Sequence, residues 1–405
     1  MNRRPRILVL NQYYKPGVEA TANLLAELCE ALAQEFEITV VTGRLNPYPD
    51  LPSDEMVDGV RVIRTRSTAF DRTKLHLRAV NYATYLADSV LRSLTLPRPD
   101  AVVTLTDPPM IGDVGLAVAR RFRVPLMVVS EDVFPEIAVE LKRLENPVLI
   151  RMLREMVSLY LRRADQVVAI GETMRLRLQE KGASADRIAV IENWVDTRRI
   201  VPRSRDTAWA REHDLVDRFV VMHSGNIGHA NDLVTLIRAA TFLRDLPDLR
   251  LVVIGFGALQ TVVRDVADRL EVDVAFLPYQ PRDILPESLS SADIHYVGLA
   301  RGLSGFVVPS RAYGIMAAGR PMLVSADEDS ETVRIARAQR CGVVVPPGRP
   351  ELVAGAIRDA YEGRFDLDEM GRRGRAYVER EADREVAVAR YRDVLARLVP
   401  SSSAR

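Results

Sequence analysis

The sequence predicts an α/β protein that contains two Rossmann-like, doubly wound units in tandem. Short apolar runs rich in β-branched residues alternate with amphipathic stretches along the chain, which is typical of parallel sheets covered on both faces. A polar, arginine-rich segment at 197–218 interrupts this alternation once. The length of 405 residues leaves room for two or three domains. We therefore expect a first domain at residues 1–197 and a second at 198–380.

The first domain is predicted from seven apolar runs, with a helix from about 21 to 34 after the first. The expected strands are 7–10, 38–42, 60–64, 101–105, 126–129, 167–170 and 188–191. Ligands of such sheets bind beyond the carboxyl ends of the strands, so the loops at those ends are where chemistry is expected.

The same pattern restarts after the polar segment and predicts the second domain. Its expected strands are 219–223, 251–254, 274–277, 294–297, 322–325 and 343–345. Its expected helices are 232–243, 258–270, 286–291, 311–318 and 351–362, and a further helix at about 381–398 closes the pattern.

Composition excludes several classes of protein. A formal net charge of +1 argues against a nucleic-acid binder that works by bulk electrostatics. Cys29 and Cys341 are the only cysteines, which excludes a disulfide framework and a multi-cysteine metal site. No apolar run is long enough to cross a bilayer, and the first strand follows the N-terminus without a signal-peptide core. We expect a cytoplasmic protein, with peripheral attachment to the inner face of the membrane left open.

A glycine-rich loop ahead of the predicted helix at 311–318 indicates an anion site. Gly302 and Gly305 lead to Ser310, a residue type that caps helix N-termini, and then to Arg311 in the first turn. Acidic residues normally occupy that turn, so an arginine there suggests that an anion is expected beside it. The alternative is an ordinary strand-to-helix turn whose arginine points to water.

A second loop of the same kind follows the strand at 219–223. It carries Gly225, Asn226, Gly228 and His229 before the next helix, and its small residues leave backbone N–H groups free for an anion. His229 could bind a phosphate or be a surface histidine. Two such loops at one sheet edge, together with an arginine, suggest a diphosphate.

Polar residues also follow two strands of the first domain. Lys15, Gly17 and Glu19 follow the first strand, and the alternative to a binding loop is a solvated one with a helix cap. Glu131, Asp132 and Glu136 lie within six residues after the strand at 126–129. Such carboxylates could orient or deprotonate an acceptor hydroxyl, or Asp132 or Glu136 could merely cap the next helix.

These segments together resemble the GT-B glycosyltransferases of family 4, the large retaining group. The similarity covers nearly the whole chain, and its set of motifs is similar to the subgroup that builds surface polysaccharides and lipid-linked repeat units. Its landmarks are Gln12–Pro16, Val40–Gly43, Asp107–Pro109, Asp132–Glu136, Asn193–Asp196, Ser224–Gly228, Val253–Gly257, Ala292–Ile294, Pro309–Arg311, Met316–Pro321, Asp327–Glu331 and Cys341–Gly348.

The resemblance implies two domains facing across a cleft, with the acceptor on the N-terminal side and the nucleotide sugar on the C-terminal side. It implies that the helix at about 381–398 packs back on the first domain. It also implies transfer with retention of anomeric configuration, no bound metal, and no cofactor besides the donor, which is a substrate.

The sequence departs from the family pattern at the donor site. The two glutamates that the family carries eight positions apart fall on Phe306 and Gly314, and its usual arginine and lysine fall on Asn226 and Asn231. In the first domain, Gly17-Val18 replaces a double glycine, and the Glu131-Asp132 region replaces a frequent histidine. We therefore expect the donor to be held by the backbone at Gly305 and Phe306, by Ser310 and Arg311, and by His229.

Three functions follow from these observations. The leading hypothesis is a glycosyltransferase with a UDP-sugar as the favoured donor and a glycan, lipid-linked or small-molecule acceptor. In it, Asp132 or Glu131 orients the acceptor and Arg311 stabilises the leaving diphosphate. The alternatives are a nucleotide-sugar epimerase or hydrolase on the same fold, and a catalytically degenerate partner protein that keeps the fold.

A basic run in the first domain could contact an anionic membrane surface. It contains interleaved apolar residues, and the alternative is a solvated loop and helix. The basic residues are Arg61, Arg64, Arg66, Arg72, Lys74 and Arg78, and the apolar ones are Phe70, Leu75 and Leu77.

Overall fold

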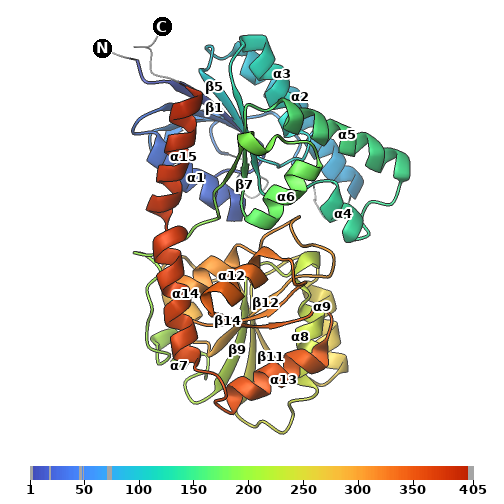
Figure 1. Ribbon diagram of the computed structural model, residues 1–405, viewed down its shortest axis with the longest axis vertical. Helices are drawn as coiled ribbons and strands as arrows, with labels where there is room; N and C mark the ends of the chain where they lie inside the picture. Colours follow the sequence, from blue (N-terminus) through green and yellow to red (C-terminus); the bar gives the residue numbers. More distant parts are fainter. Residues whose placement is uncertain (1–2, 18–19, 45–47, 49, 71–74, 400–405) are drawn as a thin grey trace. The chain divides into compact units, whose positions relative to one another are not determined.

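The computed structural model describes residues 3–17, 20–44, 48, 50–70 and 75–399 (Figure 1). The chain divides into two compact units. Unit 1 comprises Met1–Glu192 together with Ala387–Arg405, and unit 2 comprises Asn193–Val386. Each unit is a parallel sheet flanked by helices, as the alternation of apolar runs and amphipathic stretches predicts.

Unit 1 is built on an eight-stranded sheet in the order β3-β4-β2-β1-β5-β6-β7-β8. All neighbours are parallel except β3 and β4. The sequence predicts every strand but β3, which is polar, four residues long and paired only with β4. The strands are β1 Arg6–Leu10, β2 Glu37–Thr42, β3 Asp54–Val57, β4 Val60–Arg64, β5 Ala101–Thr104, β6 Leu126–Ser130, β7 Gln166–Ala169 and β8 Ile188–Val190.

The helices of unit 1 pack apolar stripes onto this sheet. In α1, Leu25, Leu28, Cys29 and Leu32 recur at helical spacing and are all buried. The helical segments are α1 Ala20–Leu32, α2 Leu75–Thr95, α3 Ile111–Phe122, α4 Glu136–Glu140, α5 Pro147–Arg163, α6 Glu172–Glu180 and the 3₁₀ turn η1 Ala185–Arg187. The last helix of the chain, α15, covers Arg384–Leu398, and its residues from Ala387 onward belong to unit 1.

Unit 2 contains a six-stranded, all-parallel sheet in the order β11-β10-β9-β12-β13-β14. Its strands are β9 Phe219–Ser224, β10 Leu249–Ile254, β11 Val274–Leu277, β12 Ile294–Gly298, β13 Met322–Ser325 and β14 Gly342–Val345. Its helices are α7 Ala208–Glu212, α8 Leu233–Ala240, α9 Gln260–Arg269, α10 Leu285–Ser290, α11 Arg311–Ala317, α12 Glu331–Gln339, α13 Pro350–Tyr361 and α14 Leu367–Glu381, with the 3₁₀ turn η2 at His229–Asn231.

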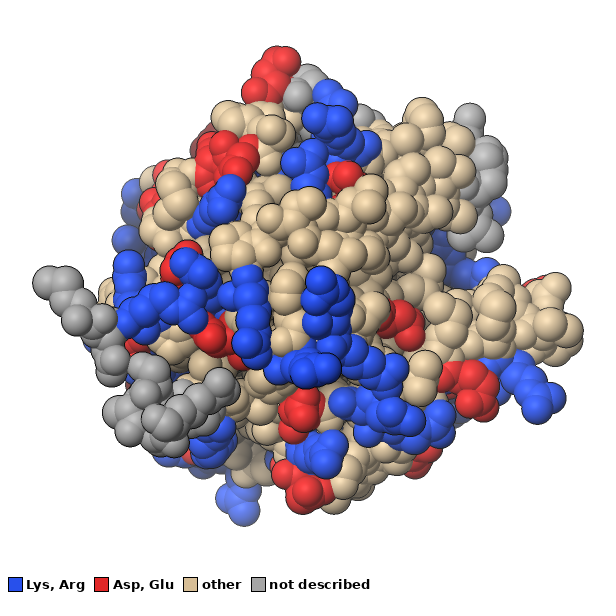
Figure 2. Space-filling model, turned by 90° about the horizontal axis from the view of Figure 1, so that it is seen from above, with Lys and Arg blue, Asp and Glu red and all other residues tan. Residues whose placement is uncertain are grey.

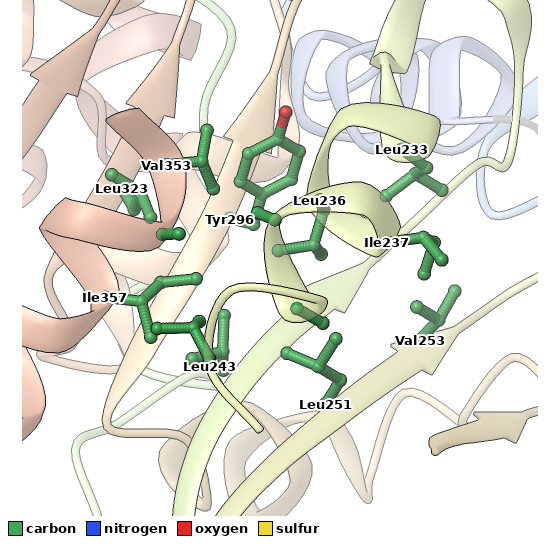
Figure 3. Close-up of a cluster of buried hydrophobic side chains, with 14 of the residues drawn as sticks. Leu233, Leu236, Ile237, Leu243, Leu251, Val253, Tyr296, Leu323, Val353 and Ile357 are labelled. Carbon is green, nitrogen blue, oxygen red and sulfur yellow. The ribbon is translucent and has the colours of Figure 1, made fainter. Parts of the chain in front are cut away.

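Apolar cores lie on both faces of the unit 2 sheet. On one face, Leu236 and Ile237 of α8 and Val353 and Ile357 of α13 pack over the strands (Figure 3). On the other face, Trp209 of α7 packs with side chains of β9 and β10. These cores fix the sheet, and with it the positions of the loops at its carboxyl edge.

The structure corrects three local predictions. Ser310 has helical backbone angles, and its side chain makes no capping hydrogen bond, so α11 begins without the predicted cap. The predicted helix at 381–398 is instead the last residue of α14 followed by α15, which begins at Arg384. Neither Asp132 nor Glu136 caps the helix that follows it, because Pro135 occupies the N-cap position of α4.

Candidate functional site

The carboxyl edge of the unit 2 sheet brings glycine-rich loops into close contact. The strand order changes direction between β9 and β12, which is where ligands of open α/β sheets bind. The loops after β9 and β10 touch at Gly225 and Gly255: a Cβ added at Gly255 would lie 2.0 Å from the Gly225 carbonyl oxygen. Gly255 also has a φ of +129°. Only glycine fits there, so the loop backbones form one tightly packed surface.

Arg311 is held in place by neutral hydrogen-bond acceptors beneath these loops. One terminal nitrogen donates to the Asn231 side-chain oxygen at 2.7 Å, and the other donates to the Gly298 carbonyl oxygen at 2.8 Å. Its aliphatic Cδ lies 3.5 Å from the position of a Cβ at Gly225. The guanidinium therefore connects the loops after β9 and β12.

The charge of Arg311 is not neutralised within the part of the chain that the structure describes. No described carboxylate lies within ion-pair distance of its guanidinium, and its buried Nε has no hydrogen-bond partner. Burial lowers the pKa of Arg311 to about 10, so the side chain stays protonated at neutral pH. A buried cation among neutral acceptors is a suitable partner for an anionic ligand.

His223, a residue that sequence reasoning missed, lies next to this cation. It is fully buried, and its Nε2 is 3.3 Å from the Asn226 carbonyl oxygen. Burial and the nearby Arg311 charge hold the pKa of His223 well below its usual value. The imidazole is therefore neutral, and it leaves Arg311 as the charged group at this point. The sequence feature that could have identified His223 is its position near the end of an otherwise apolar strand.

Two exposed aromatic rings lie beside the Gly255 loop. Phe256 and Tyr279 contact each other edge to face with ring centroids 4.7 Å apart, and they are 51% and 41% exposed. The Tyr279 ring lies 3.4 Å from the position of a Cβ at Gly255. The carboxyl edge of unit 2 thus combines a buried cation with an exposed aromatic surface.

The predicted donor residues lie in the loops around Arg311. Gly225, Asn226 and Gly228 form the loop after β9, and His229 is exposed in η2. Gly305 adopts a φ of +77° in the loop before α11, beside the partly buried Phe306. Asn231, where the family pattern has a basic residue, holds Arg311. The loops therefore meet at Arg311, while His229 is placed at the surface.

At Gly314, one of the two positions where a glutamate was expected, there is room for a side chain. A Cβ there would meet only the Leu289 Cδ1, at 3.7 Å, which is ordinary contact. The position lies in α11, three residues after Arg311. Packing around Gly314 therefore does not explain why the sequence lacks a glutamate at this position.

The carboxyl edge of the unit 1 sheet gathers carboxylates. Thr106, after β5, accepts hydrogen bonds from the backbone N–H groups of Glu131 and Asp132 at 3.2 and 3.4 Å. Ser130 donates to the Asp132 carbonyl oxygen at 3.2 Å. These bonds fix the loop after β6 against the loop after β5, where the neighbouring residue is Asp107.

Asp132 has a strongly perturbed pKa. Burial, with added repulsion from Asp107 and Glu131, raises it to about 7, and Arg78 opposes the rise. A carboxyl group with a pKa near neutrality can both accept and return a proton, which is what general acid–base chemistry requires. Sequence reasoning identified Asp132 and Glu131 but missed the contributions of Asp107 and Arg78.

Arg78 reaches this site from α2. Its Nε donates to the Tyr82 hydroxyl at 2.6 Å, and its guanidinium carbon lies 5.2 Å from the centroid of the Tyr82 ring. The guanidinium is thereby fixed near Asp107 and Asp132. The sequence placed Arg78 in a basic run without distinguishing it from its neighbours.

The predicted acceptor-side residues are engaged in structural contacts. Lys15 pairs with Glu30 and Asp58. Glu136 pairs with Lys181 at 2.7 Å and with Arg154 at 3.1 Å. Gly17 is buried, and its backbone N–H donates to the Tyr14 carbonyl oxygen, while Glu19 lies outside the described residues.

Two of the four described arginines of the basic run form ion pairs with described carboxylates. Arg61 pairs with Asp54 and Arg64 with Glu55, while Arg72 and Lys74 lie outside the described residues. Within the described ranges, no helix is long and apolar enough to cross a membrane. The same part of the chain holds no group of three or more metal-ligating side chains.

Comparison with known proteins matches both halves of the chain to glycosyltransferase families. Residues 17–194 match the family described as a glycosyl transferase 4-like domain, and residues 206–377 match glycosyl transferases group 1. WbjE of Pseudomonas aeruginosa, described as a glycosyltransferase, is 28% identical over 73% of this chain and 74% of its own length. The colanic acid biosynthesis glycosyl transferase WcaI of Escherichia coli is 30% identical over 56% of this chain and 55% of its own length.

Solved structures share the fold. HepE of Anabaena, crystallised with UDP-glucose, superposes with a TM-score of 0.74 at 15% identity, covering 97% of this chain and 99% of HepE. At that identity the likeness bears on the fold alone. The predicted pair of doubly wound units is thereby confirmed.

Proposed function

Because the chain belongs to the family 4 glycosyltransferases of the GT-B fold, we propose that it transfers a sugar from a nucleoside diphosphate sugar to an acceptor hydroxyl. A UDP-sugar is the favoured donor, in keeping with the UDP-glucose bound to HepE. Assembly of a surface polysaccharide or glycolipid is the favoured setting, in keeping with the colanic acid enzyme WcaI.

The observation that carries this proposal is the buried guanidinium of Arg311. It is protonated, held by the neutral acceptors Asn231 and Gly298, and faces no described carboxylate. Transfer from a nucleoside diphosphate sugar develops negative charge on the leaving diphosphate. A fixed, partly buried cation at a glycine-lined edge stabilises that charge without reorganisation, which lowers the barrier.

The reaction that we propose retains the anomeric configuration and needs no metal ion. The acceptor oxygen forms a bond to the anomeric carbon as the bond from that carbon to the phosphate oxygen breaks. The acceptor's proton passes to the leaving phosphate, and Arg311 balances the remaining charge. In unit 1, Asp132 has a pKa of about 7 and is suited to orient the acceptor hydroxyl, with Glu131 beside it.

Replacing Arg311 tests the proposal. We expect Arg311→Ala to lower kcat at least tenfold, since removing one charge-stabilising group costs about 10²–10³ in comparable sites. Arg311→Lys keeps the positive charge but loses the pair of terminal nitrogens that bind two acceptors, so kcat should fall less than in Arg311→Ala. Urea unfolding of both variants would separate a catalytic effect from loss of the Asn231 and Gly298 contacts. Unchanged kcat in a folded Arg311→Ala variant would remove the residue from the diphosphate site.

A catalytically degenerate partner protein is the second candidate, and Phe306 and Gly314 favour it because the family carries glutamates there. Such a protein would keep the fold, with or without nucleotide binding, and would show no turnover. Incubation with the donor and a panel of acceptors distinguishes the two functions, because only an enzyme releases nucleoside diphosphate. Incubation with the donor alone detects a hydrolase or epimerase.

Peripheral attachment to an anionic membrane remains part of the proposal. Pairing of Arg61 and Arg64 with carboxylates leaves the basic run a weak basis for it. Co-sedimentation with vesicles that contain an anionic lipid, compared with neutral vesicles, measures attachment directly. Equal recovery with both vesicle types would contradict it.

A further inference from the structure

A pocket opens at the opposite edge of the unit 1 sheet from the carboxylate loops. It lies between the C-terminal ends of α3 and α5 and has a volume of about 370 Å³. Leu116, Val124 and Leu126 form its apolar floor. Leu126 begins β6, and Ser130 ends it about 13 Å away at the usual rise per residue. Asp132 lies beyond Ser130. The pocket is therefore separate from the proposed acceptor site.

Three arginines line this pocket: Arg120, Arg123 and Arg163. All three are exposed, and no described carboxylate lies within ion-pair distance of any of them. The one acidic residue in the pocket, Asp165, uses its carboxylate to accept the Leu126 backbone N–H at 2.9 Å. The three guanidiniums thus share one pocket whose single carboxylate forms no ion pair with them.

Several other arginines at this end of unit 1 form ion pairs. Figure 2 looks onto the end where β1 begins and shows Lys and Arg side chains gathered there among scattered acidic ones. Arg3 pairs with Asp100 at 2.8 Å, and Arg6 pairs with Glu37 at 3.0 Å. Arg162, next to Arg163, reaches Glu155 at 3.7 Å. Ion pairs thus engage several arginines at this end, but none of the three that line the pocket.

The two helix ends do not account for this charge. A helix C-terminus carries about half an elementary negative charge, so α3 and α5 together supply about one. Asp165 supplies one more, against three guanidiniums. The balance stays positive even before Arg121, in the last turn of α3, is counted. Like charges held together in one pocket repel each other, and a bound anion would remove that repulsion.

We propose that this pocket is a second anion site, which binds the phosphate or diphosphate group of a ligand. Guanidinium forks match phosphate oxygens in pairs, and three of them around one pocket suit a multiply charged group. The apolar floor suits a phosphate that carries an organic substituent. The phosphate could come from a soluble metabolite or from a lipid headgroup. This inference does not depend on the proposed transferase activity.

Titration calorimetry of the full chain with inorganic pyrophosphate tests the proposal. The titration is run in an Arg311→Gln background, so that the proposed donor site does not contribute. Binding should weaken at least tenfold when Arg120, Arg123 and Arg163 are all replaced by Gln. A matched control replaces Arg269, Arg372 and Arg380 by Gln, which changes the net charge equally but leaves the pocket intact. The control should bind within twofold of its parent.

Vesicles that contain phosphatidylglycerol identify the source of the phosphate. Vesicle binding that pyrophosphate displaces and that the three pocket substitutions abolish would assign a lipid headgroup. Pyrophosphate binding without vesicle binding would assign a soluble phosphate. Pyrophosphate affinity that is equal in the pocket and control variants, or no binding in the Arg311→Gln background, would overturn the proposal.

Discussion

The carboxyl edges of the two sheets have the same architecture and opposite electrostatics. In unit 1, the loops after β5 and β6 gather Asp107, Glu131 and Asp132, and the pKa of Asp132 rises to about 7. In unit 2, the loops after β9 and β12 hold Arg311, whose pKa falls to about 10. Burial is the largest cause of both shifts, and in each case it disfavours the charged form.

The difference shows how one topology serves two chemical tasks. A doubly wound sheet delivers strand ends and the loops that follow them, but it does not decide which side chains those loops carry. The acidic edge is suited to a hydroxyl group and the basic edge to a diphosphate. A glycosyltransferase needs both functions, and four experiments test whether the two edges differ in the way described.

The largest effect is expected where the unit 2 loops touch. Gly255→Ala should destabilise unit 2 by about 3 kcal/mol or more, because its Cβ would overlap the Gly225 carbonyl oxygen at 2.0 Å and its φ of +129° disfavours a side chain. Gly355→Ala in α13 is the matched control, since nothing lies within 4 Å of its Cβ, and it should be neutral or stabilising. Urea unfolding followed by tryptophan fluorescence measures both. Equal midpoints would show that the loops are not tightly packed.

The next effect concerns the acidic edge. Asp132→Asn should lower kcat about a hundredfold, because an acceptor hydroxyl misplaced by about 1 Å reacts about 10²-fold more slowly. Asp113→Asn in α3 is a useful comparison, since burial raises the pKa of Asp113 to about 6 but the residue lies outside the loop after β6. Steady-state turnover that is the same in both variants would count against a role for Asp132 in the reaction.

The two units should respond to pH in opposite directions. Asp132 has a raised pKa, so native unit 1 binds the extra proton and loses stability as pH rises from about 4 to about 7. Buried His295 has a pKa lowered to about 4, and that of His223 is also lowered, so unit 2 loses stability as pH falls below about 6.5. The free energy of unfolding of each unit should change by about 2 kcal/mol or more over its pH range, since one pKa unit corresponds to about 1.4 kcal/mol.

Each trend can be followed separately. Trp194 and Trp209 are the only tryptophans and both belong to unit 2, so their fluorescence reports that unit alone. Hydrogen exchange of β5 and β6 peptides reports unit 1. Asp132→Asn should reduce the unit 1 trend, leaving the part due to Asp113, and His295→Gln should reduce the unit 2 trend, leaving the part due to His223. Parallel pH trends in the two units would refute the electrostatic contrast.

The smallest effect is expected at Gly314. Gly314→Glu restores a carboxylate where the family carries one, and the free space around its Cβ predicts a stability change within about 1 kcal/mol. Donor affinity should then change more than stability does. Nucleotide binding by calorimetry, beside urea unfolding, measures the two. Loss of folding would show that packing excludes a side chain at this position.

The sequence predicted the fold well because buried parallel strands leave a strong signal. Runs such as 60–64, 274–277 and 322–325 coincide with β4, β11 and β13. It missed β3, a polar edge strand, and α14, whose mean hydropathy is low although Tyr377 and Val378 are buried. Local composition does not reveal β3 and α14, because their formation depends on tertiary contacts.

The candidate site could be predicted only in part. Arg311 stood out because an arginine in a first helical turn conflicts with the helix dipole, and Asp132 stood out as one of several carboxylates after a strand. The neighbours that tune them, Arg78 and His223, lie far from them in sequence. Lys15 and Glu136 were predicted from the same kind of position, yet they pair with nearby charges. The sequence pattern does not show which charged side chains form ion pairs in the folded protein.

The most direct test of the central claim is a thermal-shift panel with UDP, GDP, dTDP, ADP and CMP. A ligand at a hundred times its dissociation constant adds about 2.7 kcal/mol, or several degrees for units of this size. We predict a clear shift with one diphosphate, UDP in the first place, and a much smaller shift in Arg311→Ala. No shift with any nucleotide would contradict a nucleotide-sugar site in unit 2 and favour a partner protein without catalytic function.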